Sequence, residues 1–392
     1  MRALPTRKAI AAAALALAGL LQVAAVPAQA AAPARMVQQD QPGTEAGRLD
    51  SAIQQALQQT GVPGAIVGLW QPGQPDYVRT FGYADSATKT PMSTDLHMRL
   101  GSETKTFTAT AVLQLVDQGK VGLDDPISKY VSGVPNGDNI TLRQLLEMRS
   151  GLFPYTSDST FINKFLANPT APWTPEQLVA LGFAHPNLFA PGSQFLYDNS
   201  NYILLGLVVE KVSGQDLAGY LHDHVTGPAG LSNTYLASGT ALADPHAQGY
   251  TVQTPTGQEA ISTNWDPSWA WAAGAEVSTL NDLHKWAVDV ATGTLLGNAV
   301  QAQRTNFIPV NSANPQAGYG LGLVDISGWI GHNGSLPGYE SVAVYLPSQQ
   351  ATLVVLINSD ITYQGYEPST VIAKAITGIA TPGNIYDIPP TG

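Results

Sequence analysis

The 392-residue sequence contains no cysteine, which excludes disulfides, thiolate metal ligands and a lipid-modified N-terminal cysteine. Charge is also scarce, because Asp, Glu, Lys and Arg together make up only 12% of the residues. The 29 acidic residues outnumber the 18 basic ones, which argues against nucleic acid or an anionic membrane surface as a partner. After residue 30 no apolar run is long enough to span a bilayer, so a membrane-spanning protein is not expected.

Several catalytic signatures are missing as well. The sequence has no G-x-S-x-G nucleophile elbow, no H-E-x-x-H zinc motif and no glycine-rich phosphate loop. His222 and His224 are closely spaced, but residues two apart on a helix face different directions. We therefore expect neither a metal nor a cofactor.

The first 30 residues have the features of a secretory signal peptide. Basic residues precede an apolar, alanine-rich run at 9–26, and residues 28–30 supply a small-x-small cleavage site. An uncleaved membrane anchor is the alternative, although the run is short for one. We expect a secreted bacterial protein in which residues 31–46 form a flexible arm and residues 47–385 form the catalytic domain.

The rest of the chain is long for one hydrophobic core, so two lobes are expected. Helical periodicity occurs at 48–60, 106–119, 140–147, 174–181, 202–212, 279–292 and 370–379. Stretches typical of strands occur at 62–70, 76–83, 318–326, 328–332, 340–346 and 352–357. This order predicts an α+β fold. An antiparallel sheet flanked by helices (about 47–135 and 276–385) would hold an inserted all-helical lobe (about 136–275), with the active site in the cleft between them.

Ser102 and Lys105 are the first candidate catalytic pair. A serine hydroxyl needs a base within hydrogen-bond reach, and a spacing of three places both side chains on one helix face. The apolar segment that follows ends at Gly119 and predicts a buried helix, whose N-terminus would stabilise negative charge near Ser102. S-x-x-K also recurs by chance in long chains, so the pattern alone does not establish catalysis.

Two further clusters contain chemically useful residues. Tyr-Asp-Asn at 197–199 precedes an apolar helix; a phenol beside a lysine can shuttle protons, and an asparagine amide can bind a substrate amide. The alternative interpretation is an ordinary helix-capping loop. His-Asn-Gly-Ser at 332–335 lies among predicted strands, where glycine often marks the close approach of a backbone or ligand. A lone histidine is, however, more often structural.

Together, S-x-x-K, Y-x-N and H-x-G occur in this order, about 95 and about 135 residues apart. On these motifs the chain resembles the serine penicillin-recognising hydrolases, which include D-alanyl-D-alanine carboxypeptidases, class C β-lactamases and related esterases. Supporting strings lie at 113–126, 140–152 and 273–278, so the resemblance covers residues 47–380. It implies a β-lactamase/DD-peptidase-like fold, no cofactor, and a small-molecule or peptide substrate.

The resemblance also implies a role for each matching residue. Ser102 would be the nucleophile that forms an acyl-enzyme, and Lys105 and Tyr197 would share the proton transfers, with the general base left open between them. His332 would support Tyr197 and the leaving group. The implied substrate-binding residues are Asn199, Trp269, Asn333, Gly334 and Ser335. The backbone N–H groups of Ser102 and Ser335 would form the oxyanion hole. A place in the hydrophobic core is an equally good interpretation of Trp269.

Two departures from the family pattern concern the site. Met148 stands where the family often carries histidine. No Lys or Arg lies between residues 304 and 374, although a carboxypeptidase must bind a free carboxylate, usually with a cation. Neutral donors on Asn333 and Ser335, or a more distant Arg99, could replace that cation. An ester or a neutral amide substrate would not need one.

The leading prediction is a secreted D-alanyl-D-alanine carboxypeptidase-like hydrolase that acts on cell-wall peptides through an acyl-enzyme on Ser102. A β-lactamase or an esterase of the same fold is the alternative. A non-catalytic penicillin- or peptide-binding protein is the third possibility, and the joint presence of all the motif residues argues against it.

Overall fold

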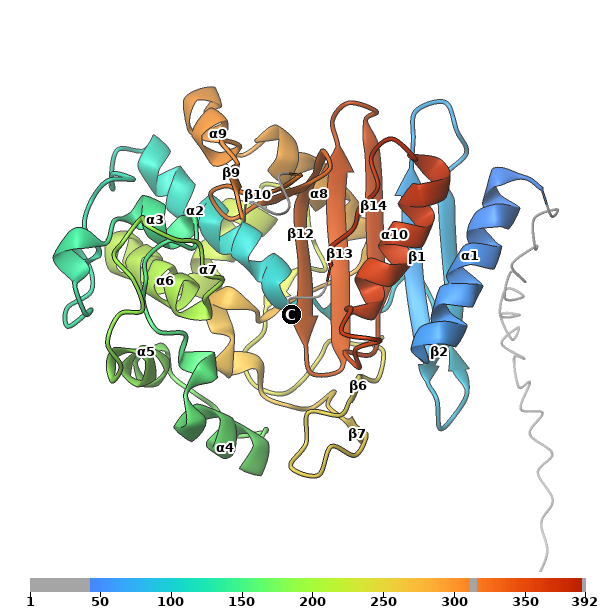
Figure 1. Cartoon of the computed structure of the whole chain (residues 1–392), viewed down its shortest axis with the longest axis horizontal. Helices are drawn as coiled ribbons and strands as arrows, with labels where there is room; N and C mark the ends of the chain where they lie inside the picture. Colours follow the sequence, from blue (N-terminus) through green and yellow to red (C-terminus); the bar gives the residue numbers. More distant parts are fainter. Residues whose placement is uncertain (1–42, 311–315, 390–392) are drawn as a thin grey trace, which may run out of the picture. The chain divides into compact units, whose positions relative to one another are not determined.

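Nine strands form one antiparallel sheet in the computed structural model, which describes residues 43–310 and 316–389 (Figure 1). The order β3-β2-β1-β14-β13-β12-β11-β10-β9 pairs early strands with late ones. Their bounds are β1 Gly64–Trp70, β2 Tyr77–Asp85, β3 Thr90–Pro91, β9 Ile308–Pro309, β10 Ala317–Tyr319, β11 Val324–Ile326, β12 Trp329–Leu336, β13 Tyr339–Leu346 and β14 Ala351–Ile357. The shorter sheets contain β4 Met98–Arg99, β5 Tyr235–Leu236 and β8 Glu276–Ser278, and β6 Tyr250–Thr251 and β7 Ala260–Ile261. The predicted α+β class is confirmed.

Helices cover both faces of the sheet centre, which is why its middle strands are continuous apolar runs. Every residue of β14 is buried. α1 Glu45–Thr60 and α10 Pro368–Ala380 pack on each other in front of the strands, and α8 Leu280–Thr292 packs behind β12, β13 and β14 (Figure 1). The sheet therefore gives β12 a rigid support from both sides.

The helical part of the described chain packs around α6, which contacts α2, α3, α5 and α7. The bounds are α2 Thr104–Asp117, α3 Leu142–Leu146, α4 Ser159–Ala167, α5 Pro175–Phe183, α6 Asn199–Ser213, α7 Leu217–Leu221 and α9 Asn298–Arg304. α4, α7 and α9 are absent from the sequence prediction. The predicted boundaries between a sheet lobe and a helical lobe stay predictions. No described helix combines the length and apolarity needed to cross a membrane.

α2 is enclosed on all sides, with eleven of its 14 residues buried. Trp286 of α8 stacks on Phe107 at 4.1 Å between ring centroids and donates its indole N–H to the Thr106 hydroxyl at 2.8 Å. The buried Arg304 donates to the Thr106 carbonyl at 3.0 Å and to the Thr110 hydroxyl at 2.9 Å. These contacts fix the helix that follows the S-x-x-K serine.

Two predicted strands differ from the observed ones. The strand expected at 318–326 is two strands, β10 and β11, because Gly322 takes φ +77° and lets the chain reverse. β12 continues to Leu336, well past the predicted end at residue 332. β11 pairs with β12 only as far as Gly331, so residues 332–336 form an open edge on that side.

The N-terminal boundary also differs. α1 begins at Glu45, inside the predicted arm, because the Thr44 hydroxyl accepts a hydrogen bond from the Gly47 N–H at 3.1 Å and caps the helix. The predicted signal peptide and residues 31–42 of the arm lie outside the described residues.

Glu276 is a buried carboxyl beside the turn that carries Ser102. Its backbone N–H donates to the Thr104 hydroxyl at 2.9 Å, and neither carboxyl oxygen has a hydrogen-bond partner among the described residues. Burial raises the pKa of Glu276 from 4.5 to about 8. The folded protein thus keeps a proton there that the unfolded chain releases, so this group lowers stability as pH rises between these values.

Glu276→Gln is expected to remove this loss of stability. Relative to wild type, the free energy of unfolding of the variant should rise by roughly 3–4 kcal/mol from pH 4.5 to pH 8, measured by urea denaturation. Glu259→Gln, at an exposed glutamate, is the matched control and should show no such rise. A constant difference between Glu276→Gln and wild type across this range would mean that Glu276 is ionised in the fold.

Candidate active site

Ser102 lies on a 3-10 turn, Gly101–Glu103, that runs directly into α2. Gly101 takes φ +58°, and a Cβ there would lie 2.5 Å from the backbone nitrogen of Ser335. Only glycine lets the turn come this close to β12. The hydroxyl of Ser102 lies 3.0 Å from Nζ of Lys105, so the structure brings the predicted pair together.

Lys105 is fully buried and has three polar neighbours. Its Nζ lies 3.0 Å from Oγ of Ser102, 2.8 Å from Oδ1 of Asn199 and 2.8 Å from the carbonyl oxygen of Ala273. Burial lowers the pKa of Lys105 well below its usual range, and the nearby Asp198 carboxylate opposes this shift. A neutral amine can donate to Asn199 and Ala273 while its lone pair accepts the Ser102 proton. The arrangement therefore suits deprotonation of the serine.

The loop before α6 places Tyr197 against the same amine. The ring centroid lies 4.8 Å from Nζ. The ring is 38% exposed, but its hydroxyl end is enclosed, and this burial raises the pKa of Tyr197 above its usual range. Tyr197 is thus a protonated phenol at neutral pH. Asp198 caps α6 by accepting from the Ser200 N–H at 2.7 Å, and the sulfur of Met148 accepts the Asp198 N–H at 3.4 Å.

His332 is held by a tyrosine that the sequence analysis did not single out. The Tyr319 hydroxyl lies 3.2 Å from Nε2 of His332, whose Nδ1 faces the carbonyl oxygen of Asn333. Burial and the charge of Lys105 lower the pKa of His332 to about 3. The ring is therefore neutral, with Nδ1–H donating to Asn333 and Nε2 accepting from Tyr319. The rings of Tyr197, Tyr319 and His332 lie 5.9–6.2 Å apart, so His332 is beside Tyr197 as predicted.

Gly334 allows β12 to approach the serine turn. A Cβ at Gly334 would lie 1.9 Å from the carbonyl oxygen of Leu100 and 2.8 Å from the nitrogen of Ser102, which leaves no room for a side chain. A Cβ at Gly101 would likewise lie 2.5 Å from the nitrogen of Ser335. The two backbone N–H groups predicted for the oxyanion hole are thus brought into one small region.

A cavity of about 540 Å³ opens beside Ser102, at the open edge of β12. Its wall includes Tyr197 and residues 332–335, which the sequence analysis named as catalytic or substrate-binding residues. Among the described residues that line it, none is Lys or Arg, whereas Glu367 and Asp387 are carboxylates. We call it the nucleophile cavity.

Candidate groups for binding a carboxylate are engaged elsewhere. Arg99 is buried and donates to three backbone carbonyl oxygens at 3.0–3.1 Å, and the buried Arg304 donates to α2. The side-chain amide of Asn333, a predicted neutral donor, donates to Oε2 of Glu367 at 2.8 Å. The described wall of the nucleophile cavity thus has no free cation for a substrate carboxylate.

A second cavity, of about 380 Å³, is lined by Asn199, Trp269 and aromatic residues of α4. The Trp269 ring centroid lies 5.9 Å from that of Phe161 and 5.2 Å from that of Phe165. Trp269 thus lines a cavity and also packs against the core. Because Asn199 contacts Lys105, this aromatic cavity adjoins the catalytic pair.

A model of the Beta-lactamase protein family matches residues 49–373, which include Ser102, Lys105, Tyr197 and His332. The chain belongs to the Beta-lactamase family. The predicted fold is that of its members.

The chain is similar to several solved structures and to several relatives of known sequence. A D-stereospecific amidohydrolase from Streptomyces sp. is 32% identical, with a TM-score of 0.76 over 85% of this chain and 98% of that one. D-amino acid amidase from Ochrobactrum anthropi SV3, complexed with D-phenylalanine, is 27% identical, with a TM-score of 0.74 over 85% and 99%. Protein flp from Staphylococcus aureus (strain MW2) is 28% identical over 81% of this chain and 64% of its own length, so this chain spans just under two thirds of it. Penicillin-binding protein 4* from Bacillus subtilis (strain 168) is 26% identical over 80% and 71%.

Tyr319→Phe tests how His332 is positioned in this Beta-lactamase family site. The change removes the hydroxyl that donates to Nε2, and we expect kcat to fall roughly 10-fold with KM unchanged. Loss of a donor to the neutral ring should also raise the pKa of His332, moving the acidic limb of the kcat profile to higher pH. Tyr345→Phe is the matched control and should change neither. A raised KM with unchanged kcat would instead mean that Tyr319 contacts substrate directly.

Proposed function

We propose that the chain hydrolyses amide bonds whose leaving group is uncharged, through an acyl-enzyme on Ser102. The observation that carries this proposal is the nucleophile cavity, which has two carboxylates and no Lys or Arg among its described lining residues. Such a wall offers no cation to the free carboxylate at the end of a D-Ala-D-Ala peptide, whereas a simple amide needs none.

The proposed proton transfers follow from the groups around the serine. Neutral Lys105 takes the Ser102 proton as the oxygen attacks the substrate carbonyl, and the N–H groups of Ser102 and Ser335 bind the oxyanion. The Tyr197 phenol protonates the leaving nitrogen and regains a proton from Lys105. Water then attacks the acyl-enzyme, gives a proton to Lys105, and releases the acid as Ser102 is reprotonated. His332 keeps Tyr197 in place.

The comparisons support an amidase and suggest its stereochemistry. The Streptomyces protein is a D-stereospecific amidohydrolase, and the Ochrobactrum protein is a D-amino acid amidase. The alignment with this chain covers almost the whole length of both proteins. We therefore propose a D-configured acyl part, whose apolar side chain fits the aromatic cavity of Trp269.

The test compares D-phenylalanine amide, L-phenylalanine amide and an N-acetylated D-Ala-D-Ala peptide. We expect ammonia release from the D-amide with a kcat/KM at least roughly 10-fold above that of the L-amide, and no detectable D-Ala release. Faster D-Ala release than amide hydrolysis would overturn the proposal. So would the absence of a Ser102 adduct on folded protein after treatment with an activated ester and with penicillin, which would indicate a non-catalytic binding protein.

A D-alanyl-D-alanine carboxypeptidase remains the second candidate. The relative named penicillin-binding protein 4* favours it, and Ser335 could supply a neutral hydrogen-bond donor. Rapid turnover of penicillin would instead support a β-lactamase, and turnover of short-chain esters alone an esterase.

We also propose export, on the basis of the signal-peptide pattern in residues 1–30. An N-terminus at residue 31 in protein recovered from the culture medium would support this proposal. Retention of residues 1–30 in a membrane fraction would support the anchor instead.

A further inference from the structure

Glu367 is an acidic residue of the nucleophile cavity that the proposed proton transfers do not use. It immediately precedes α10, and its Oε2 accepts from the Asn333 amide at 2.8 Å. Asn333 and Ser335 lie two residues apart on β12, about 7 Å at the usual strand rise. Glu367 therefore lines the same cavity as the proposed oxyanion hole.

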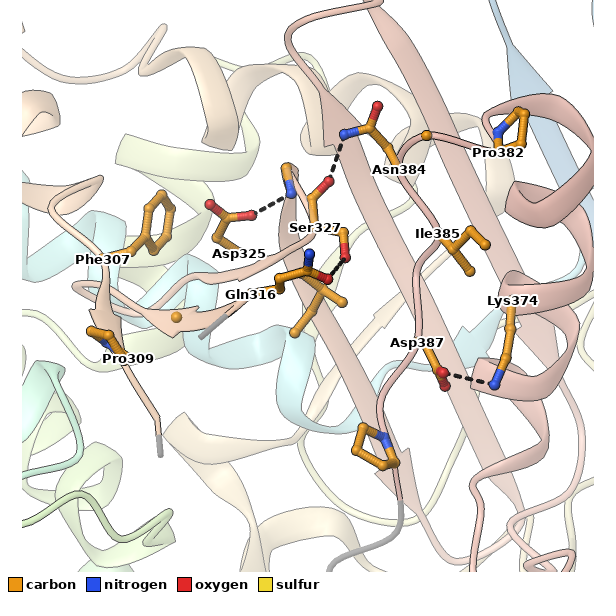
Figure 2. Close-up of a pocket in the computed structure, with 15 residues that line it drawn as sticks. Phe307, Pro309, Gln316, Asp325, Ser327, Lys374, Pro382, Asn384, Ile385 and Asp387 are labelled. Atoms are coloured by element: carbon orange, nitrogen blue, oxygen red, sulfur yellow. Dashed lines mark hydrogen bonds and ion pairs between the residues drawn. The ribbon is translucent and has the colours of Figure 1, made fainter. Parts of the chain in front are cut away.

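The other carboxylate of this wall already has a cation. Asp387 pairs with Lys374 of α10 at 2.6 Å, as Figure 2 shows. Glu367 forms no ion pair among the described residues, and its one printed side-chain partner is the neutral Asn333 amide. The carboxyl of this wall that has no cation partner among the described residues is thus that of Glu367.

A second buried carboxyl interacts with Glu367. Glu340 of β13 is 1% exposed and interacts electrostatically with Glu367. Its Oε2 accepts from the Ser369 N–H at 2.9 Å, but its Oε1 has no hydrogen-bond partner among the described residues. Burial and mutual repulsion raise the pKa of Glu340, and burial raises the pKa of Glu367. A cation brought into the cavity would stabilise the ionised form of Glu367, since buried charges are stable only when paired.

We propose that Glu367 binds a primary ammonium group of the substrate, so that the preferred substrates are amides carrying a free amine. This inference rests on the proposed amidase function and defines its substrate class. An ammonium has three donors and fits one carboxylate held by a neutral amide, whereas an acetylated amine has lost both the charge and two of the donors. The two forms thus differ in the charge and the donors that they present to Glu367.

The test uses two p-nitroanilides that differ only at the amine, those of D-phenylalanine and N-acetyl-D-phenylalanine. In wild type we expect kcat/KM to be roughly 10–100-fold higher for the free amine. In Glu367→Gln this ratio should fall to near unity. A ratio is used because a general loss of activity from disturbed folding affects both substrates equally and cancels.

Asp387→Asn is the matched control, because it removes a carboxylate of the same wall that already has a lysine partner. It should keep the wild-type ratio. Nα-acetyl-D-lysine p-nitroanilide places the ammonium on the side chain, and a Glu367-dependent preference for it would also support an ammonium site. A wild-type ratio near unity, or a high ratio that persists in Glu367→Gln, would overturn the inference.

The proposed function can fail separately from this inference. If p-nitrophenyl butyrate leaves no acyl group on Ser102 of the wild-type protein, the serine mechanism itself is wrong. If the neutral ester acylates Ser102 but the two anilides are cleaved equally, only the role of Glu367 is wrong.

Discussion

Ser102→Ala is expected to abolish acyl-enzyme formation and to lower amide hydrolysis by roughly 10⁴–10⁶-fold. The serine oxygen lies 3.0 Å from the buried Lys105 amine, so the change removes the atom that the proposed base would deprotonate. Intact-protein mass spectrometry after treatment with an activated ester measures the adduct. Release of p-nitroaniline measures turnover.

Ser193→Ala is the matched control, because Ser193 is exposed and its hydroxyl donates only to the nearby Ala190 carbonyl. It should retain labelling and turnover. Both variants should unfold near the wild-type temperature, since neither change creates a large cavity. Equal labelling of Ser102→Ala and wild type would refute Ser102 as the nucleophile.

Lys105→Met is expected to lower kcat by roughly 10²–10⁴-fold, the usual contribution of a general base. Methionine has a similar length and suits a fully buried position, so the loss should reflect the missing amine rather than unfolding. In wild type, activity should rise with pH as Lys105 loses its proton, at a pH below the usual lysine range because burial lowers the pKa of Lys105. Stopped-flow acylation across pH measures both effects.

Lys285→Met removes a lysine that donates to the Gly230 carbonyl and is the matched control. It should leave both the rate and the pH profile unchanged. If Lys105→Met keeps the wild-type rate, the base is Tyr197. If Lys105→Met lowers the rate but the rate still rises with pH as in wild type, a group other than Lys105 titrates in that pH range.

The sequence predicts what depends on local spacing and on motif order. Ser102 and Lys105 are three residues apart, so helix geometry alone brings their side chains together. The roles of Tyr197 and His332 could be assigned only through the family resemblance, because these residues come from segments far from the serine in the sequence. The α+β class followed from the order of apolar patterns, and the sheet confirms it.

The features that the sequence did not predict depend on strand ends and on long-range contacts. Asn333 was expected to offer its amide to substrate, but β12 extends to Leu336 and the amide donates to Glu367 instead. Tyr319 lies between two glycines in a region predicted as one strand, so its contact with His332 became visible only with the turn at Gly322. A tyrosine flanked by glycines is the signal that could have drawn attention to it.

The enclosure of α2 has a consequence for how this protein could change. Backbone amides in a helix buried on every side exchange with solvent only through global unfolding, so α2 belongs to the slowest-exchanging part of the molecule. The walls of the two cavities, by contrast, include short helices and loops, such as α4 and the segment before α10. Substitutions there could alter which acyl groups enter while the chemistry on Ser102 stays intact. A directed-evolution library for new substrates should therefore vary these walls and leave α2 untouched.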